Sequence, residues 1–291
     1  MNRPEITGSG VTVKAEDLIA LRAHLAPGAE QSITASALPG GFAVARRGNG
    51  QVIADSRLYI NGDDLRHIDR GATARTGDLH VRTFHEERDK VTFLVADFRP
   101  SMLWGMRHAL RSVTAAHALA WLGWQAVEAG GRVGLLAITA DERFLVSSRP
   151  RVSGMLAVIG GLVRSHAHAI SGSIETTMDP ELSDMLSGLD RLVPRGAEVV
   201  IASALDYRGA EFAATLGGLS RHRSARFLMI EEQALKDLPA GTYPLRRSDG
   251  TKSHAIFRKG ATTAGPDNRE LEGYQIDYID TGRPVQGSGG A

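Results

Sequence analysis

The feature that most constrains this chain is a repeated alternation of short apolar runs and helix-like stretches, which starts at residue 91. The runs are VTFLVAD (91–97), VGLLAIT (133–139), EVVIASA (198–204) and ARFLMIE (225–231). They are too continuously apolar for strands with one face in water, so they indicate strands buried within a sheet. Helices between such strands favour parallel pairing with helices on both faces. The chain is therefore expected to have an α/β fold with a doubly wound, mostly parallel sheet.

The other expected elements follow from periodicity and from turn residues. RFLVSS (143–148) is expected to form a hairpin with the strand before it, and QIDYID (275–280) to form a further strand. Two strands are expected in 241–259, with Asp249-Gly250 at the turn. Helices are expected at 16–26, 103–129, 151–164, 181–193 and 209–222.

The composition changes along the chain and suggests four parts. Residues 1–30 form an N-terminal helix and lead-in. Residues 31–89 form a small β subdomain that ends in a strongly charged stretch, which is expected to be largely solvated. Residues 90–282 hold the main sheet, and residues 283–291 form a flexible tail.

Charge and residue usage argue against several classes of protein. The formal net charge is +1 and aromatic residues make up 5% of the chain, so no nucleic-acid surface is expected. The chain has no cysteine, which excludes disulfides and thiolate metal sites. Neither a signal peptide nor an apolar stretch long enough to span a membrane is visible, so a cytoplasmic protein is expected. Neither a Gly-x-Ser-x-Gly elbow nor a Walker A motif occurs.

Asp97 ends the first buried strand and is followed by Arg99 and Ser101. Open α/β sheets bind ligands at the carboxyl ends of their strands. The loop 97–102 is therefore the first candidate for a functional site.

Two segments resemble a known family. The loop VADFRPSM carries Asp97, Arg99, Ser101 and Met102. The segment before it carries a set of polar and glycine positions, which are Tyr59, Gly62, Asp63, Asp64, Arg66, Asp69, Arg75 and Glu86-Glu87. Together they resemble the bacterial domain-of-unknown-function family with a von Willebrand factor A-like fold that accompanies MoxR-type AAA+ ATPases. The resemblance implies that fold, and it marks the positions from Tyr59 to Arg75 as a structural signature of the family.

The resemblance also implies a metal-ion-dependent adhesion site, in which one aspartate and two serines of the first loop help to bind magnesium. This sequence departs from that pattern. Arg99 replaces the first serine, and a guanidinium has no acceptor for a metal. Ala204 stands where a later aspartate is expected, with Asp206 two residues beyond, and Asp179 or Pro180 stands nearest to an expected threonine. The site is therefore interpreted as degenerate, with Arg99 pairing with Asp97 in place of a metal. No cofactor is expected; a Mg²⁺ ion would use Asp97, Ser101 and Asp206.

The resulting hypothesis is a non-enzymatic interaction or adaptor protein. By resemblance, its partners are a MoxR-type AAA+ ATPase and an unknown client, in protein remodelling or metalloenzyme maturation. Asp97, Arg99 and Ser101 are the predicted partner-binding residues, with Arg99 taking a partner carboxylate. Two alternatives stay open. One is a metal-dependent enzyme that uses Asp63, Asp64, Asp69 and Asp97, and the other is a small-ligand binder over the same loop.

The histidines suggest no strong metal site. His166 and His168 would point the same way from an extended segment, but two ligands without a third make a poor zinc site. His117 lies on an apolar helix stripe and is interpreted as a packing residue.

Overall fold

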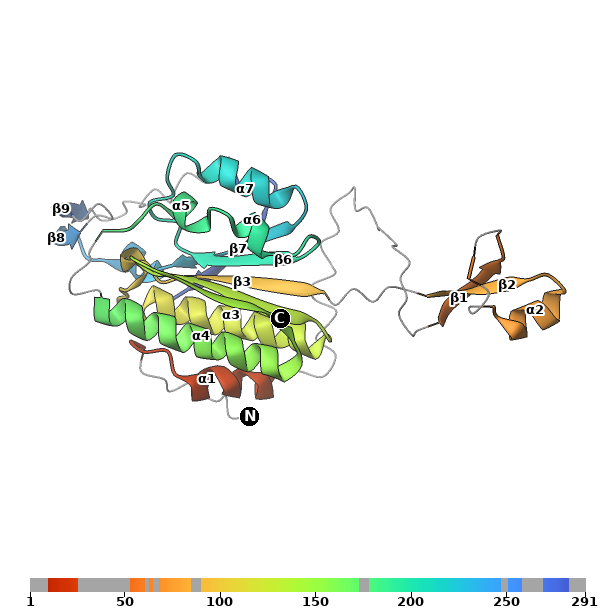
Figure 1. The fold of residues 1–291 in the computed structure, drawn as a ribbon. Helices are drawn as coiled ribbons and strands as arrows, with labels where there is room; N and C mark the ends of the chain where they lie inside the picture. Colours follow the sequence, from red (N-terminus) through yellow and green to blue (C-terminus); the bar gives the residue numbers. More distant parts are fainter. Residues whose placement is uncertain are drawn as a thin grey trace. The chain divides into compact units, whose positions relative to one another are not determined.

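The structure is a computed structural model of the 291-residue chain, and it describes residues 10–25, 53–60, 63–64, 68–84, 90–172, 178–246, 251–257 and 269–282. The chain divides into two compact units (Figure 1). Unit 1 comprises Met1–Glu30 and Lys90–Ala291, and unit 2 comprises Gln31–Asp89. The predicted tail at 283–291 lies outside the described residues.

Unit 1 is built on a six-stranded sheet with the order β10-β7-β6-β3-β4-β5. All neighbouring pairs are parallel except β4 and β5, which are antiparallel. The strands are β3 (Val91–Asp97), β4 (Arg132–Ile138), β5 (Arg143–Pro150), β6 (Glu198–Ser203), β7 (Ser224–Glu231) and β10 (Gln275–Asp280). The predicted α/β fold with a mostly parallel sheet is confirmed, as is the hairpin partner after β4.

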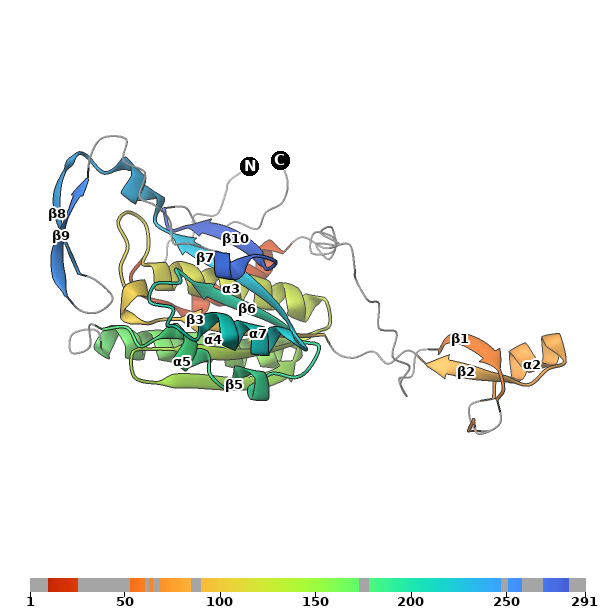
Figure 2. The same ribbon diagram turned by 90° about the horizontal axis from the view of Figure 1, so that it is seen from above.

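Helices cover both faces of this sheet (Figures 1 and 2). One face carries α1 (Ala15–Ala20), α3 (Arg111–Glu128) and α4 (Arg151–Gly172), and the other carries α5 (Leu182–Leu186), α6 (Leu189–Leu192) and α7 (Phe212–Ser220). Successive residues of β3 serve the two cores in turn. Leu94 and Ala96 belong to the first core, whereas Phe93 and Val95 belong to the second. This alternation explains why β3 is apolar without interruption from Phe93 to Ala96, since a strand with both faces covered has no side left for water.

The strand order reverses at β3, and this reversal marks one position along the carboxyl-end edge of the sheet. From β3 the chain passes to β4 and β5 on one side, then crosses to β6 and β7 on the other. The crevice at the carboxyl ends of the two strands that flank such a reversal is the usual ligand position in doubly wound sheets. Here those strands are β3 and β6, which end at Asp97 and Ser203.

Three predicted helices differ from the structure. The helix predicted at 103–129 begins only at Arg111, because the segment before it folds as a loop with other partners for its backbone. The Met106 N–H donates to Glu232 Oε2 (2.9 Å) and the Arg111 N–H donates to the Trp104 carbonyl (2.9 Å). Trp104 and Met106 are therefore loop residues, and Met106 is exposed.

The other two differences are a longer helix and a helix that is broken in two. Helix α4 continues to Gly172, so it includes the histidines that were predicted on an extended segment. The helix predicted at 181–193 is two short helices, α5 and α6, separated at Gly188, whose φ of 74° falls in the left-handed region that favours glycine.

Strands β8 (Gly241–Arg246) and β9 (Lys252–Phe257) form a separate antiparallel ribbon, as predicted. The predicted turn at Asp249-Gly250 lies outside the described residues. In the described part of the chain, no helix is long and apolar enough to cross a membrane.

Unit 2 contains an antiparallel pair, β1 (Ile53–Leu58) and β2 (His80–Phe84), and the helix α2 (Arg70–Thr76). The charged stretch at the end of residues 31–89 therefore holds regular structure, namely α2 and β2, which its charge density did not suggest. Asp69 begins α2 as its N-cap, because its carboxylate accepts hydrogen bonds from the Gly71 and Ala72 N–H groups.

Candidate functional site

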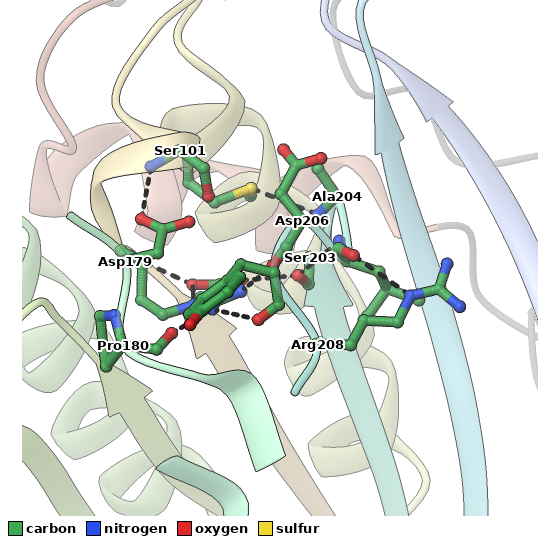
Figure 3. Close-up of polar contacts among 12 residues, drawn as sticks. Ser101, Asp179, Pro180, Ser203, Ala204, Asp206 and Arg208 are labelled. Carbon is green, nitrogen blue, oxygen red and sulfur yellow. Dashed lines mark hydrogen bonds and ion pairs between the residues drawn. The ribbon is translucent and has the colours of Figure 1, made fainter. Parts of the chain in front are cut away.

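The first loop of the site follows β3 and begins within the core. Asp97 and Arg99 are both 0% exposed, and a short 3-10 helix at Pro100–Met102 completes the turn. Two further loops lie beside it, at 178–181 and 204–209 (Figure 3). We call the loops 98–110, 178–181 and 204–209 the rim.

Arg99 pairs with Asp97 through two parallel hydrogen bonds. Its Nε donates to Asp97 Oδ1 (3.0 Å) and its Nη2 donates to Asp97 Oδ2 (2.9 Å). This bidentate geometry is the strongest form of an arginine–carboxylate contact. The sequence-based expectation that Arg99 pairs with Asp97 agrees with this geometry.

The remaining N–H groups of Arg99 bind backbone carbonyls of the other two loops (Figure 3). Nη1 donates to Pro180 O (2.7 Å) and Tyr207 O (3.1 Å), and Nη2 donates to Asp206 O (2.9 Å). A guanidinium has five N–H donors, so every donor of Arg99 is used. One buried side chain thus joins all three loops of the rim.

Asp97 is held equally firmly on its other side. Ser203 Oγ donates to Asp97 Oδ2 (2.6 Å) and accepts from the Leu205 N–H (2.8 Å). Burial alone would lower the pKa of Arg99, but the charge and hydrogen bonds of Asp97, with the charges of Asp179 and Asp206, raise it instead. The Arg99 guanidinium therefore keeps its positive charge in the folded protein.

The loop 204–209 carries two strained residues. Leu205 and Tyr207 are not glycine, yet their φ values are 56° and 46°. Such left-handed backbone costs on the order of 1–2 kcal/mol per residue. The hydrogen bonds from Arg99 to the carbonyls of Asp206 and Tyr207 offset that cost by holding the loop in this conformation.

Asp179 ties the loop 178–181 to the first loop. Its Oδ1 accepts the Ser101 N–H (2.9 Å), and the residue is only 3% exposed. Burial raises the pKa of the Asp179 carboxyl. Asp179 Oδ2 and Ser101 Oγ are buried and have no hydrogen-bond partner among the described residues.

These side chains do not fit a magnesium ion. Both oxygens of Asp97 accept hydrogen bonds, and the Arg99 guanidinium occupies the position beside them where a cation would sit. Mg²⁺ needs about six oxygen ligands in near-ideal geometry. Ala204 provides no side-chain oxygen at the end of β6, and its N–H contacts Met102 Sδ (3.3 Å).

Of the three predicted partner-binding residues, Asp97 and Arg99 lie below the surface, whereas Ser101 is half-buried. Asp97 and Arg99 have no exposed area, so neither can touch a partner in this conformation. Their role in binding stays a prediction, and the structure restricts it to holding the loops that a partner would contact. Asp206, the conditional metal ligand, lies on the surface side of the rim and pairs with Arg111 Nη1 (3.0 Å).

The signature residues of unit 2 serve local structure where they are described. Asp63 forms a bidentate pair with Arg57 (2.6 and 2.7 Å), which lowers the pKa of its carboxyl, and Asp69 caps α2. Tyr59, Asp64 and Arg75 are also described, and Arg75 Nε donates to Gly71 O (3.3 Å). Gly62, Arg66 and Glu86-Glu87 lie outside the described residues.

The histidines occupy different environments from those predicted for 166 and 168. On α4, residues two apart point about 200° away from each other. His166 is buried and contacts Ser112 Oγ (3.0 Å), whereas His168 is partly exposed and contacts Asp141 (3.0 Å). His117 packs on α3 with a hydrogen bond between its Nδ1 and Val113 O (2.8 Å).

Several site residues were not singled out from the sequence. Arg111, Ser203, Glu232 and Thr281 all join the rim or its edge of the sheet. Three of them share a signal, because Ser203 ends β6 while Glu232 and Thr281 directly follow β7 and β10. Polar residues at the ends of buried parallel strands would have identified these three. Arg111 had no such signal.

A pocket of about 170 Å³ lies away from the rim. It is lined by residues 186–190 and by 214–216, 218 and 219, near α5, α6 and α7. It does not bear on the hypothesis of a small-ligand site over the loop 97–102.

Comparisons with known proteins identify a family and several relatives. A family model described as "Protein of unknown function DUF58" matches residues 55–252, which include the rim. Relatives include the uncharacterized proteins Mb1516 of Mycobacterium bovis and Rv1480 of Mycobacterium tuberculosis. Each is 29% identical over 184 residues, covering 56% of this chain and 58% of the relative. The chain thus matches less than two thirds of the relatives' length, and the family model matches more than half of the chain. The chain belongs to the DUF58 family.

Proposed function

We propose that this chain is a non-enzymatic interaction protein whose rim is organised by Arg99 instead of a metal ion. The observation that carries the proposal is the complete use of the Arg99 guanidinium. It neutralises Asp97 and binds three carbonyls from two other loops. A divalent ion bound at such an edge would provide the same two things, positive charge and a link between loops.

The fold supports an assignment to the von Willebrand factor A-like class. The sheet has one antiparallel edge strand, helices on both faces and an aspartate at the carboxyl end of its central strand. Within this proposal the rim is the partner-binding surface, because it lies at the reversal of strand order. Exposed apolar residues support it, since Met106 is 41% and Tyr207 46% exposed.

By resemblance, the partner is a MoxR-type AAA+ ATPase, and the pair acts on an unknown client in the cytoplasm. The ATPase would supply the mechanical work and this chain the recognition. Remodelling of a protein or maturation of a metalloenzyme is the proposed process. No contact among the described residues favours the alternative of a metal-dependent enzyme that uses Asp63, Asp64, Asp69 and Asp97, because Asp63 and Asp69 are committed to structural hydrogen bonds.

The test is co-purification with ATP present, followed by binding measurements on the purified pair. Tagged wild type, Arg99→Met and Met106→Asp would be compared, with folding checked by circular dichroism. We expect an AAA+ ATPase to be recovered with wild type, and its binding to weaken at least about tenfold in Met106→Asp, which leaves the core untouched. Failure to recover any AAA+ ATPase, or unchanged binding by both variants, would contradict the proposal.

The proposal that the rim binds no metal needs its own measurement. Adding EDTA to the co-purification would not test it, because EDTA also removes magnesium from the ATPase. Calorimetry of the isolated chain with MgCl₂ isolates this chain's contribution. We expect no binding heat for wild type; saturable binding at millimolar or lower concentration would contradict the arginine-organised rim.

A further inference from the structure

A second arginine–aspartate pair lies at the surface side of the rim, and its geometry is incomplete. Arg111 Nη1 donates to Asp206 Oδ2 (3.0 Å). The two side chains make no other hydrogen bond to each other, so the pair is held through one of the two parallel bonds that an arginine and a carboxylate can form.

Both members of the pair have unused capacity. Arg111 is only 9% exposed, and its buried Nε has no hydrogen-bond partner in the described part of the chain. The Asp206 side chain is 39% exposed and directed away from Pro180 and Ser203 (Figure 3). Buried polar groups are normally satisfied, so an under-used guanidinium at a surface calls for an explanation.

The surroundings hold this pair in place. The Arg111 guanidinium lies 4.2 Å from the centroid of the Trp104 ring. The carbonyl of Asp206 is bound by Arg99 Nη2, so its backbone is fixed from inside the protein. The next residue, Tyr207, exposes 46% of its surface, and an aromatic residue beside an open polar pair is typical of protein-binding surfaces.

Local charge decides which chemical group suits the pair. A partner carboxylate at Arg111 would meet the negative charges of Asp206, Glu231 and Glu232, all of which act on the Arg111 guanidinium. A partner cation at Asp206 would meet the positive charge of Arg111. The neutral side-chain amide of Asn or Gln avoids both repulsions because it carries no net charge, and it offers both N–H donors and a carbonyl acceptor.

We propose that the Arg111–Asp206 pair binds an amide group in an extended peptide segment of the partner. The amide N–H donates to Asp206, and the amide oxygen accepts from Arg111. The segment lies against Trp104 and Tyr207. This inference rests on the proposed function of the rim as a partner-binding surface.

The test uses three blocked peptides of equal length, one neutral and rich in Asn and Gln, one acidic and one basic. Each is titrated into the full-length ¹⁵N-labelled protein, and the Arg111 Nε–H and Trp104 indole N–H signals are followed. We expect the neutral peptide to bind most tightly and to shift both signals. The neutral peptide should bind about tenfold more weakly to Asp206→Asn, because the asparagine amide can present a donor where the carboxylate presented an acceptor.

Asp190→Asn is the matched control, because it removes an exposed carboxylate on α6 away from the pair. Tighter binding of the acidic or the basic peptide would overturn the inference. So would absent binding, or equal loss in the control. If the purified ATPase binds wild type and Asp206→Asn equally well, this inference fails while the proposed function stands. If the neutral peptide binds as expected but no AAA+ ATPase is recovered, the peptide site stands while the proposed ATPase partner fails.

Discussion

Two arginine–aspartate pairs join the rim to the elements beside it, and they differ in nearly every physical respect. In the Asp97–Arg99 pair, both side chains are buried and every N–H donor is used. In the Asp206–Arg111 pair, one hydrogen bond joins side chains that are 39% and 11% exposed. A saturated buried pair holds the fold and has nothing to offer a ligand. An unsaturated pair at the surface adds little stability and keeps donors and acceptors available.

The sharpest test of this difference is the removal of the buried guanidinium. Arg99→Met leaves Asp97 as an uncompensated buried charge and frees three carbonyls, so we expect a loss of about 3–5 kcal/mol in unfolding free energy. Urea denaturation followed by circular dichroism would measure it. A loss below about 1 kcal/mol would mean that the pair does not hold the rim.

A second comparison of a buried with a partly exposed group is possible on α4, where His166 and His168 should affect the pH dependence of stability differently. Burial lowers the pKa of His166 from 6.5 to about 4, and its ring contacts Phe98 with centroids 5.3 Å apart. The unfolded chain therefore binds the proton more readily than the folded protein between about pH 6.5 and 4. Stability is complete above pH 6.5 and falls by about 3 kcal/mol as the pH drops to 4.

Denaturation curves at several pH values would show this dependence, and His166→Gln should remove much of it. His168→Gln is the control, since His168 lies two residues further on and is partly exposed. Equal pH dependence in wild type and His166→Gln would argue against a buried neutral histidine.

Backbone strain in the loop 204–209 offers a third test. Tyr207 has a φ of 46°, which glycine adopts freely and alanine does not. Tyr207→Gly and Tyr207→Ala lose the same aromatic ring, so their difference reports the strain. We expect the glycine variant to be more stable by about 1 kcal/mol in thermal unfolding. An alanine variant of equal or greater stability would show that the loop is not held in a strained form.

The smallest effect is expected at the surface pair. Asp206→Asn should change the unfolding free energy by less than about 1 kcal/mol, because a partly exposed single contact is weak. The same urea titration used for Arg99→Met would measure it. A loss comparable to that of Arg99→Met would erase the distinction between the two pairs.

The sheet was predictable because its strands carry a local signal. β3 and β6 are apolar on both faces, and that pattern requires only neighbouring residues to be recognised. The start of α3 was not predictable in this way. Residues 103–110 look helical, but Glu232, 126 residues from Met106, accepts the Met106 N–H and stabilises a loop. No local pattern reports such a contact.

Only the local part of the candidate site was predictable, because the sequence reports contacts between neighbouring residues and not contacts between distant ones. The replacement of a serine by Arg99 is visible in the sequence, and its pairing with Asp97 involves residues two positions apart. The carbonyls that use the rest of the guanidinium come from positions 81, 107 and 108 residues away. The burial of Arg99, which excludes direct contact with a partner, depends on those distant loops.

Hydrogen exchange of the isolated chain tests the central claim most directly, namely that Arg99 and not a metal ion holds the three loops together. The informative amides are those of Leu182, Ser183 and Leu205, whose acceptors are Tyr207 O, Arg208 O and Ser203 Oγ. We predict equal protection of these amides in wild type with EDTA and with Mg²⁺. In Arg99→Met we predict loss of their protection while the amides of β3 and β6 stay protected. Loss of protection in wild type on adding EDTA, or full protection in Arg99→Met, would contradict the claim.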